Sequence, residues 1–160
     1  MNSNVHLSRT NPDHLDFRKL IALLDENLNE NNGEEAQSFF RQFNKTDEIK
    51  HVIIAYMEGI AIACGSIKEY DSATMELKRM FVHPEFRNTG IASKILAHLE
   101  HWAQEMGYER CILETGEKQK EAVILYQKRG YQLIPNYGQY ENVAGSICME
   151  KKLKNLSSTV

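Results

Sequence analysis

Hydrophobic residues recur along the chain with two different periods, and the change of period separates strands from helices. Apolar, β-branched runs predict strands at residues 5–9, 49–57, 60–69, 73–82, 110–115, 131–134 and 146–153. Apolar residues at helical spacing predict helices at residues 12–26, 36–43, 91–106 and 121–129. Polar runs predict loops at residues 27–35 and 135–145. The resulting order, β-α-α-β-β-β-α-β-α-β-β, indicates an α/β (α+β) domain.

The longest apolar stretch, residues 49–67, is predicted to be a β-hairpin that turns at Glu58-Gly59 rather than a membrane span. It is rich in β-branched residues, and Lys50, His51 and Glu58 interrupt it. Residues 1–10 lack the hydrophobic segment of a secretory signal. We therefore expect a cytoplasmic protein with no membrane partner.

Length and composition fit one domain over residues 1–154, followed by a flexible tail at 155–160. The formal net charge of −3 argues against a nucleic-acid partner, which normally requires a basic surface. Cys64, Cys111 and Cys148 all lie in apolar, strand-like runs. Because their number is odd, we expect buried, reduced thiols rather than a disulfide framework or a metal site.

The most informative segment is Val-His-Pro-Glu-Phe-Arg-Asn-Thr-Gly-Ile-Ala at residues 82–92, where a strand gives way to a helix. The first backbone N–H groups of a helix have no partner within it, and the helix dipole is positive there. Gly90 lets the main chain approach a ligand closely because it has no Cβ. We therefore expect a pyrophosphate to bind the main chain of Arg87, Asn88, Thr89, Gly90, Ile91, Ala92 and Ser93.

Neither of the common nucleotide-binding motifs is present, neither Gly-x-x-x-x-Gly-Lys-Ser/Thr nor Gly-x-Gly-x-x-Gly. Instead, Arg87-x-x-Gly90-x-Ala92 resembles the coenzyme A signature of the GCN5-related N-acetyltransferase (GNAT) family, Gln/Arg-x-x-Gly-x-Gly/Ala. The order of elements matches that family over nearly the whole chain. The resemblance implies the GNAT acyl-CoA N-acyltransferase fold, with a mixed, mostly antiparallel sheet flanked by helices. It also implies acetyl-CoA as cosubstrate, its pantetheine arm pairing with the main chain of Met80, Phe81 and Val82.

A second signature lies on the late helix, where Leu125-Tyr126-x-x-x-Gly130-Tyr131 resembles the Leu-Tyr-x-x-x-Gly-Phe/Tyr pattern of the family. The resemblance implies that Tyr126 binds the cofactor and protonates the departing thiolate, since a phenol has a pKa of about 10. The alternative is a half-buried aromatic residue without a catalytic role. The family often has an asparagine seven residues earlier, where this chain has Gln119, and we expect Gln119 to contact the cofactor arm.

The general base is less defined by the sequence. Many family members have a glutamate where this chain has Lys78. Glu76 lies two residues earlier and is expected on the same face as Lys78 and Met80. Glu114, at the end of the next strand, is the other candidate base. Either could act directly or through water, or the amine could lose its proton to bulk solvent.

The acceptor pocket is expected to form from the loops near residues 27–36 and 135–145. Arg79, Tyr137 and Tyr140 are the candidate acceptor-binding residues, and an acidic, aromatic mouth would suit a cationic amine. The alternative is that these polar residues only keep the surface soluble. His98 and His101 share one side of a helix, but no third ligand stands at recognisable spacing, so no metal is expected.

Several segments after residue 113 resemble a bacterial subgroup of small-molecule acetyltransferases. We therefore expect an enzyme that transfers acetyl from acetyl-CoA to a primary amine of a small molecule, by direct attack in a ternary complex. A peptide or protein amine, a longer acyl group, or a catalytically silent coenzyme A sensor remain alternatives. Many relatives pair as dimers, so a homodimer is possible.

Overall fold

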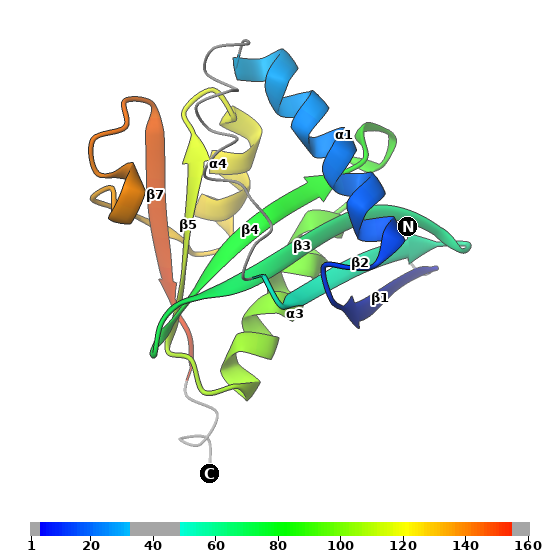
Figure 1. Ribbon diagram of the computed structural model, residues 1–160, viewed down its shortest axis with the longest axis horizontal. Coiled ribbons are helices and arrows are strands. Elements are labelled where there is room, and N and C mark those ends of the chain that lie inside the picture. The colour runs from blue at the N-terminus through cyan, green and yellow to red at the C-terminus, as the bar shows by residue number, and fades with distance from the viewer. Residues whose placement is uncertain (1–3, 33–48, 155–160) are drawn as a thin grey trace.

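A mixed β-sheet forms the centre of the molecule (Figure 1). The computed structural model describes residues 4–32 and 49–154, and their side chains except at residues 27–32. In this part of the chain seven strands lie in the order β1-β2-β3-β4-β5-β7-β6. Their bounds are β1 Val5–Thr10, β2 His51–Met57, β3 Ile60–Asp71, β4 Thr74–Val82, β5 Arg110–Gly116, β6 Gln132–Ile134 and β7 Ser146–Lys152. All neighbours pair antiparallel except β4 and β5, which confirms the mixed, mostly antiparallel sheet.

Helices cover both faces of this sheet (Figure 1). Helix α1 (Leu15–Asn32) packs on one face, and α3 (Ile91–Glu105) packs on the other face with α4 (Lys120–Lys128). The prediction of a loop from residue 27 was wrong over residues 27–32, because the first strong helix breaker of that polar run is Gly33. The predicted helix at 36–43 and the predicted tail at 155–160 lie outside the described residues.

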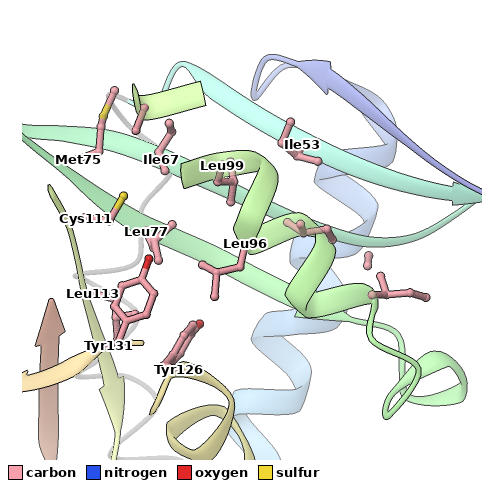
Figure 2. Packing of buried hydrophobic residues seen from close by; sticks show 14 of the residues in the cluster. Ile53, Ile67, Met75, Leu77, Leu96, Leu99, Cys111, Leu113, Tyr126 and Tyr131 are labelled. Carbon is pink, nitrogen blue, oxygen red and sulfur yellow. The ribbon is translucent and has the colours of Figure 1, made fainter. Parts of the chain in front are cut away.

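Two apolar clusters fill the space between the sheet and its helices. Ile53 of β2 packs with Ile95 and Leu99 of α3, whereas its neighbour Ile54 packs with Phe17 of α1. Figure 2 shows Ile53, Leu96 and Leu99 in the first cluster. Because both faces of the central strands are buried, these strands are apolar almost without interruption. Each fully buried aliphatic side chain stabilises the fold by about 1.5–3 kcal/mol.

The predicted hairpin and the predicted state of the cysteines are both confirmed. Residues 49–67 form the β2–β3 hairpin, with Glu58 and Gly59 in the left-handed region at φ 51° and 82°. Cys64, Cys111 and Cys148 are buried free thiols. Among the described residues, no helix is both long and apolar enough to cross a lipid bilayer.

Strand β4 contains a β-bulge that decides which side chains face the site. Lys78 pairs with Ser66 and Phe81 pairs with Cys64, so Arg79 and Met80 together oppose Gly65. Arg79 has a left-handed φ of 57°. A Cβ on Gly65 would overlap the side chains of Met80, Ile95 and Leu99, so any larger residue beneath the bulge would force them to shift.

The bulge reverses the alternation of side chains along β4. Glu76 and Lys78 face the α1 side of the sheet, whereas Met80 packs in the cluster on the α3 side. The prediction that Glu76, Lys78 and Met80 share one face was therefore wrong for Met80, because the extra residue shifts the alternation by one.

Candidate active site

A cleft opens where strands β4 and β5 separate. Their parallel pairing runs only from Thr74–Arg110 to Glu76–Ile112, and beyond it the strands diverge around a cavity of about 740 Å³. Every residue expected to hold the cofactor lines this cavity except Thr89: Met80, Phe81, Val82, Arg87, Asn88, Gly90, Ile91, Ala92, Ser93, Gln119 and Tyr126. The other end of the same cavity is lined by Lys78, Arg79 and Glu114.

The turn before α3 presents main-chain donors to this cleft. Gly90 is the N-cap of α3 with φ 85°, and no side chain caps the helix. The first helical hydrogen bond runs from Lys94 N–H to Gly90 at 3.1 Å. The N–H groups of Ile91, Ala92 and Ser93 consequently donate to no atom of the described residues. Such a group of unpaired donors at the positive end of a helix fits a diphosphate.

Two side chains fix the shape of this turn. The Arg87 Nε donates a hydrogen bond to the Val82 carbonyl at 2.9 Å, which ties the turn to the end of β4. The Thr89 hydroxyl donates to the Phe86 carbonyl at 2.5 Å, and Thr89 does not line the cleft. Thr89 therefore does not line the cleft with its neighbours, because its side chain closes the turn instead.

Three lysines of this cleft were not predicted from the sequence. Lys118, Lys120 and Lys128 line the same cleft as Arg87 and bring positive charge to it. Positive side chains favour the phosphates of a nucleotide-like ligand. The signal was the Glu-Lys-Gln-Lys run at residues 117–120, but a charged run in a sequence is usually a solvated surface. Gln119 lies between two of these lysines as the N-cap of α4.

Tyr126 of α4 lines the cleft. Its side chain is buried, and its hydroxyl makes no hydrogen bond with the described residues. Burial raises the pKa of the Tyr126 phenol above its ordinary value. Its ring meets the edge of the Tyr131 ring, with centroids 5.8 Å apart (Figure 2).

The neighbour of Tyr126 is itself firmly held. The Tyr131 hydroxyl donates to Glu100 at 2.9 Å, and Lys151 Nζ donates to the other carboxylate oxygen at 2.9 Å. Tyr131 is 3% exposed and belongs to the core. The network therefore restricts the orientation of the Tyr126 ring.

A buried polar cluster supports the opposite end of the cleft. Lys78 Nζ donates to the Tyr140 hydroxyl at 2.9 Å and lies 3.7 Å from a Glu76 carboxylate oxygen. The Tyr137 hydroxyl donates to the same oxygen of Glu76 at 2.5 Å. Burial raises the pKa of both phenols and lowers that of Lys78, whereas the Glu76 charge acts on Lys78 in the opposite direction.

The two tyrosines do not form the open mouth that the sequence suggested. Tyr140 is 1% exposed, and neither Tyr137 nor Tyr140 lines the cleft. The short helix η2 (Gly138–Tyr140) packs back onto the sheet, and the two rings meet edge to face at 5.6 Å. They pack behind Glu76 and Lys78 and support them, so a contact of either tyrosine with the acceptor stays a prediction.

The two candidate bases have different surroundings. Glu76 is 2% exposed, is bonded to Tyr137 and Lys78, and does not line the cleft. Glu114 of β5 does line the cleft and accepts one hydrogen bond, from the Ser146 hydroxyl at 2.7 Å. Burial raises the pKa of Glu114, while Ser146 and Lys78 act in the opposite direction. Glu114 is thus the carboxyl that a molecule in the cleft can reach.

Arg79 lies where the sequence predicted an acceptor-binding residue. It lines the cleft, and its Nη1 lies 2.7 Å from an oxygen of Asp25, which α1 contributes. The acidic side chains at residues 27–36, expected around the acceptor, lie outside the side chains that the structure describes. Asp25, two residues before that range, is the acidic residue that α1 brings here.

The two helical histidines have protein partners. The Arg9 Nε donates to His98 at 3.1 Å, and His101 lies 3.0 Å from Glu105. Over residues 4–32 and 49–154, no group of three or more potential ligands could hold a metal ion.

Comparison with known proteins places this architecture in a family. Residues 17–131 match the family model described as "Acetyltransferase (GNAT) family". The IAA acetyltransferase of Azospirillum brasilense is 29% identical over 151 residues, which cover 94% of this chain and 99% of that protein. A Klebsiella pneumoniae structure described as an acyl-CoA N-acyltransferase is 26% identical, with a TM-score of 0.78 over 94% of this chain and 98% of that one.

A third relative supports the fold alone. The GNAT family acetyltransferase of Elizabethkingia anophelis, solved with acetyl-CoA bound, is 17% identical and has a TM-score of 0.71 over 94% of this chain and 99% of that one. The family model spans both the turn before α3 and the Tyr126 segment. The chain therefore belongs to the acetyltransferase (GNAT) family of acyl-CoA-dependent enzymes.

Proposed function

We propose that this protein transfers the acetyl group of acetyl-CoA to the primary amine of a small molecule, by direct attack in a ternary complex. One observation carries the proposal: a single cleft joins a main-chain anion site to a buried phenol and a reachable carboxyl. The acetyl-CoA bound to the Elizabethkingia relative and the acetyltransferase activity named for the Azospirillum relative support it.

The chain's own groups match the parts of the cosubstrate. The N–H groups of Ile91, Ala92 and Ser93 would bind the pyrophosphate, and the lysines at residues 118, 120 and 128 would add positive charge. The part of β4 that follows Glu76 has no partner in β5, so its main chain is free to pair with the amides of the pantetheine arm. Acetyl-CoA, when bound, supplies an activated thioester.

Glu114 is the proposed general base. It reaches the cleft, and the raised pKa of its carboxyl makes the carboxylate a better proton acceptor once it is ionised. It would take a proton from the acceptor ammonium or amine, directly or through water. Glu76 already holds Lys78 and Tyr137 behind the wall and would position them instead.

Tyr126 is the proposed general acid. Its raised pKa keeps the phenol protonated at neutral pH, as a group that donates a proton to a departing thiolate must be. Its hydroxyl makes no hydrogen bond with the described residues, so the proton is available to a ligand. None of the three cysteines lines the cleft, and burial raises the pKa of each thiol, which favours direct attack over an acetyl-cysteine intermediate.

The test is to incubate the protein with acetyl-CoA and a panel of small amines and peptides while free thiol is measured. We expect thiol release with small amines, and a higher melting temperature with coenzyme A alone. Release with peptides only would assign a peptide or protein amine as the acceptor. Lys78, at the position where relatives often have a glutamate, favours a second candidate, a coenzyme A sensor. Coenzyme A binding without thiol release for every amine would select that sensor.

A further inference from the structure

Two consecutive cations, Lys78 and Arg79, line the acceptor end of the cleft. Neighbouring residues of a regular strand point to opposite faces of the sheet. The bulge at Arg79 removes that constraint, and both side chains face the α1 side, where Arg79 contacts Asp25. A left-handed φ of 57° at a residue other than glycine is strained, and such strain concentrates at functional sites.

The anions that balance these cations lie behind them. Glu76 pairs with Lys78 and Asp25 pairs with Arg79, yet neither carboxylate lines the cavity. Both cationic side chains are nearly buried, with 6% and 7% of their side-chain surface exposed. At this end, the cavity wall therefore presents two held cations beside one carboxyl, Glu114.

Arg79 keeps hydrogen-bond donors to spare. Its Nη1 donates to Asp25 at 2.7 Å, but its buried Nε has no hydrogen-bond partner. A guanidinium has five N–H donors in a planar fork that matches a carboxylate, and burial strengthens such a pair.

We propose that the acceptor is an amino carboxylate, a small molecule whose carboxylate binds Arg79 and Lys78 while its amine faces Glu114. This inference rests on the proposed acetyl transfer and adds the second functional group of the substrate. The charges complement each other: cations face the carboxylate, and the carboxyl of Glu114 faces the amine. A simple amine would leave the guanidinium donors unused.

The first test uses the unchanged protein and matched acceptors. Each series contains an amino carboxylate, its carboxamide, and the amine without that group. We expect kcat/KM for the carboxylate to exceed that of both analogues by about ten- to a hundredfold, the range of one charge-assisted hydrogen bond. Equal or faster turnover of the carboxamides would overturn the inference and leave the proposed function intact. Absence of turnover with all amines would overturn both.

The second test replaces Arg79. In Arg79→Gln, we expect KM for the amino carboxylate to rise about tenfold or more, because a charged pair is lost. KM for acetyl-CoA and for the carboxamide should stay the same, and Arg79→Lys should recover part of the loss. Arg18→Gln, an exposed arginine outside the cleft, is the matched control and should change nothing.

A purely structural role for Arg79 would give a different pattern. Arg79→Gln would then impair the carboxylate and the carboxamide acceptors equally, and that result would contradict the inference. Melting temperatures with and without coenzyme A show whether the variant is folded. If it does not fold, the acceptor series on the unchanged protein still decides the question.

Discussion

The two ends of the cleft are formed by different kinds of chemical group. The end near α3 is made of backbone: unpaired N–H groups at a helix start and the unpaired edge of β4. The end near Glu114 is made of side chains from β4 and β5, which bond to side chains of α1, β7 and the loop before β7. A backbone site depends on chain conformation, whereas a side-chain site depends on residue identity and on packing.

This difference has a consequence for how the family can diversify. The backbone end tolerates most side-chain changes, provided that the turn keeps Gly90 in the left-handed region. The side-chain end can take a new acceptor through one or two substitutions, such as lysine in place of the usual glutamate at residue 78. Cosubstrate binding is then shared across the fold, while acceptor choice is local.

The largest effect is expected at Tyr126, which lines the same cleft. Tyr126→Phe should lower kcat by about 10²- to 10⁴-fold, the usual contribution of a general acid. The affinity for coenzyme A should change little, because the phenyl ring and its contact with Tyr131 remain. Steady-state kinetics and calorimetric titration measure the two quantities. Tyr56→Phe, whose hydroxyl donates to Asp16 instead, is the control, and an unchanged kcat in Tyr126→Phe would exclude Tyr126 as the acid.

The next largest effect on kcat is expected at Glu114, the carboxyl that reaches the cleft. Glu114→Gln should lower kcat by about 10²-fold, since the base is lost. In the unchanged protein the rate should rise with pH through the raised pKa of Glu114, because only the ionised carboxyl accepts a proton. The variant should lose this rise. A pH–rate profile that keeps the same rise in Glu114→Gln would refute the assignment.

Thermal stability should also distinguish Glu114 from Glu76, but here the larger loss is expected for the Glu76 variant. When a carboxyl has a higher pKa in the folded than in the unfolded protein, the free energy of unfolding falls as the pH rises from the unfolded to the folded pKa. Glu114→Gln should remove that loss and keep or raise the melting temperature at neutral pH. Glu76→Gln should instead destabilise the fold by about 3–5 kcal/mol, because it leaves Lys78 buried without its carboxylate. Thermal unfolding of both variants checks this contrast.

The smallest effect concerns the backbone end and has a close control on the same helix. Gly90 and Gly107 flank α3, both with left-handed φ, at 85° and 90°. Alanine at either position should cost about 1–2 kcal/mol of stability. Only Gly90→Ala should also weaken coenzyme A binding, by about tenfold, the loss of one hydrogen bond to a charged group. Equal coenzyme A affinity in the two variants would argue against the turn as the phosphate site.

The sequence was informative wherever a local pattern carries the physics. Period and turn residues predicted the strands, the Glu58-Gly59 hairpin and the helix that begins after Gly90. The Arg87-x-x-Gly90-x-Ala92 motif predicted the cleft-lining turn because its donors come from consecutive residues. The exception was Thr89, whose side chain forms a hydrogen bond within the turn rather than facing the cleft.

Local sequence patterns could not predict contacts between residues that lie far apart in the chain. The bulge in β4 results from pairing with Gly65, and it moved Met80 to the other face of the sheet. The burial of Tyr140 against Lys78 joins residues 62 positions apart, which no spacing rule connects.

By itself, the sequence determined the family, the order of the described elements and the cleft-lining turn before α3, because these follow from short-range periodicity and from the conformational freedom of glycine. The tertiary structure alone decided that Glu114 rather than Glu76 reaches the cleft, and that Lys78 and Arg79 present adjacent charges to it. The physical reason is that burial and electrostatics depend on which distant segments pack together.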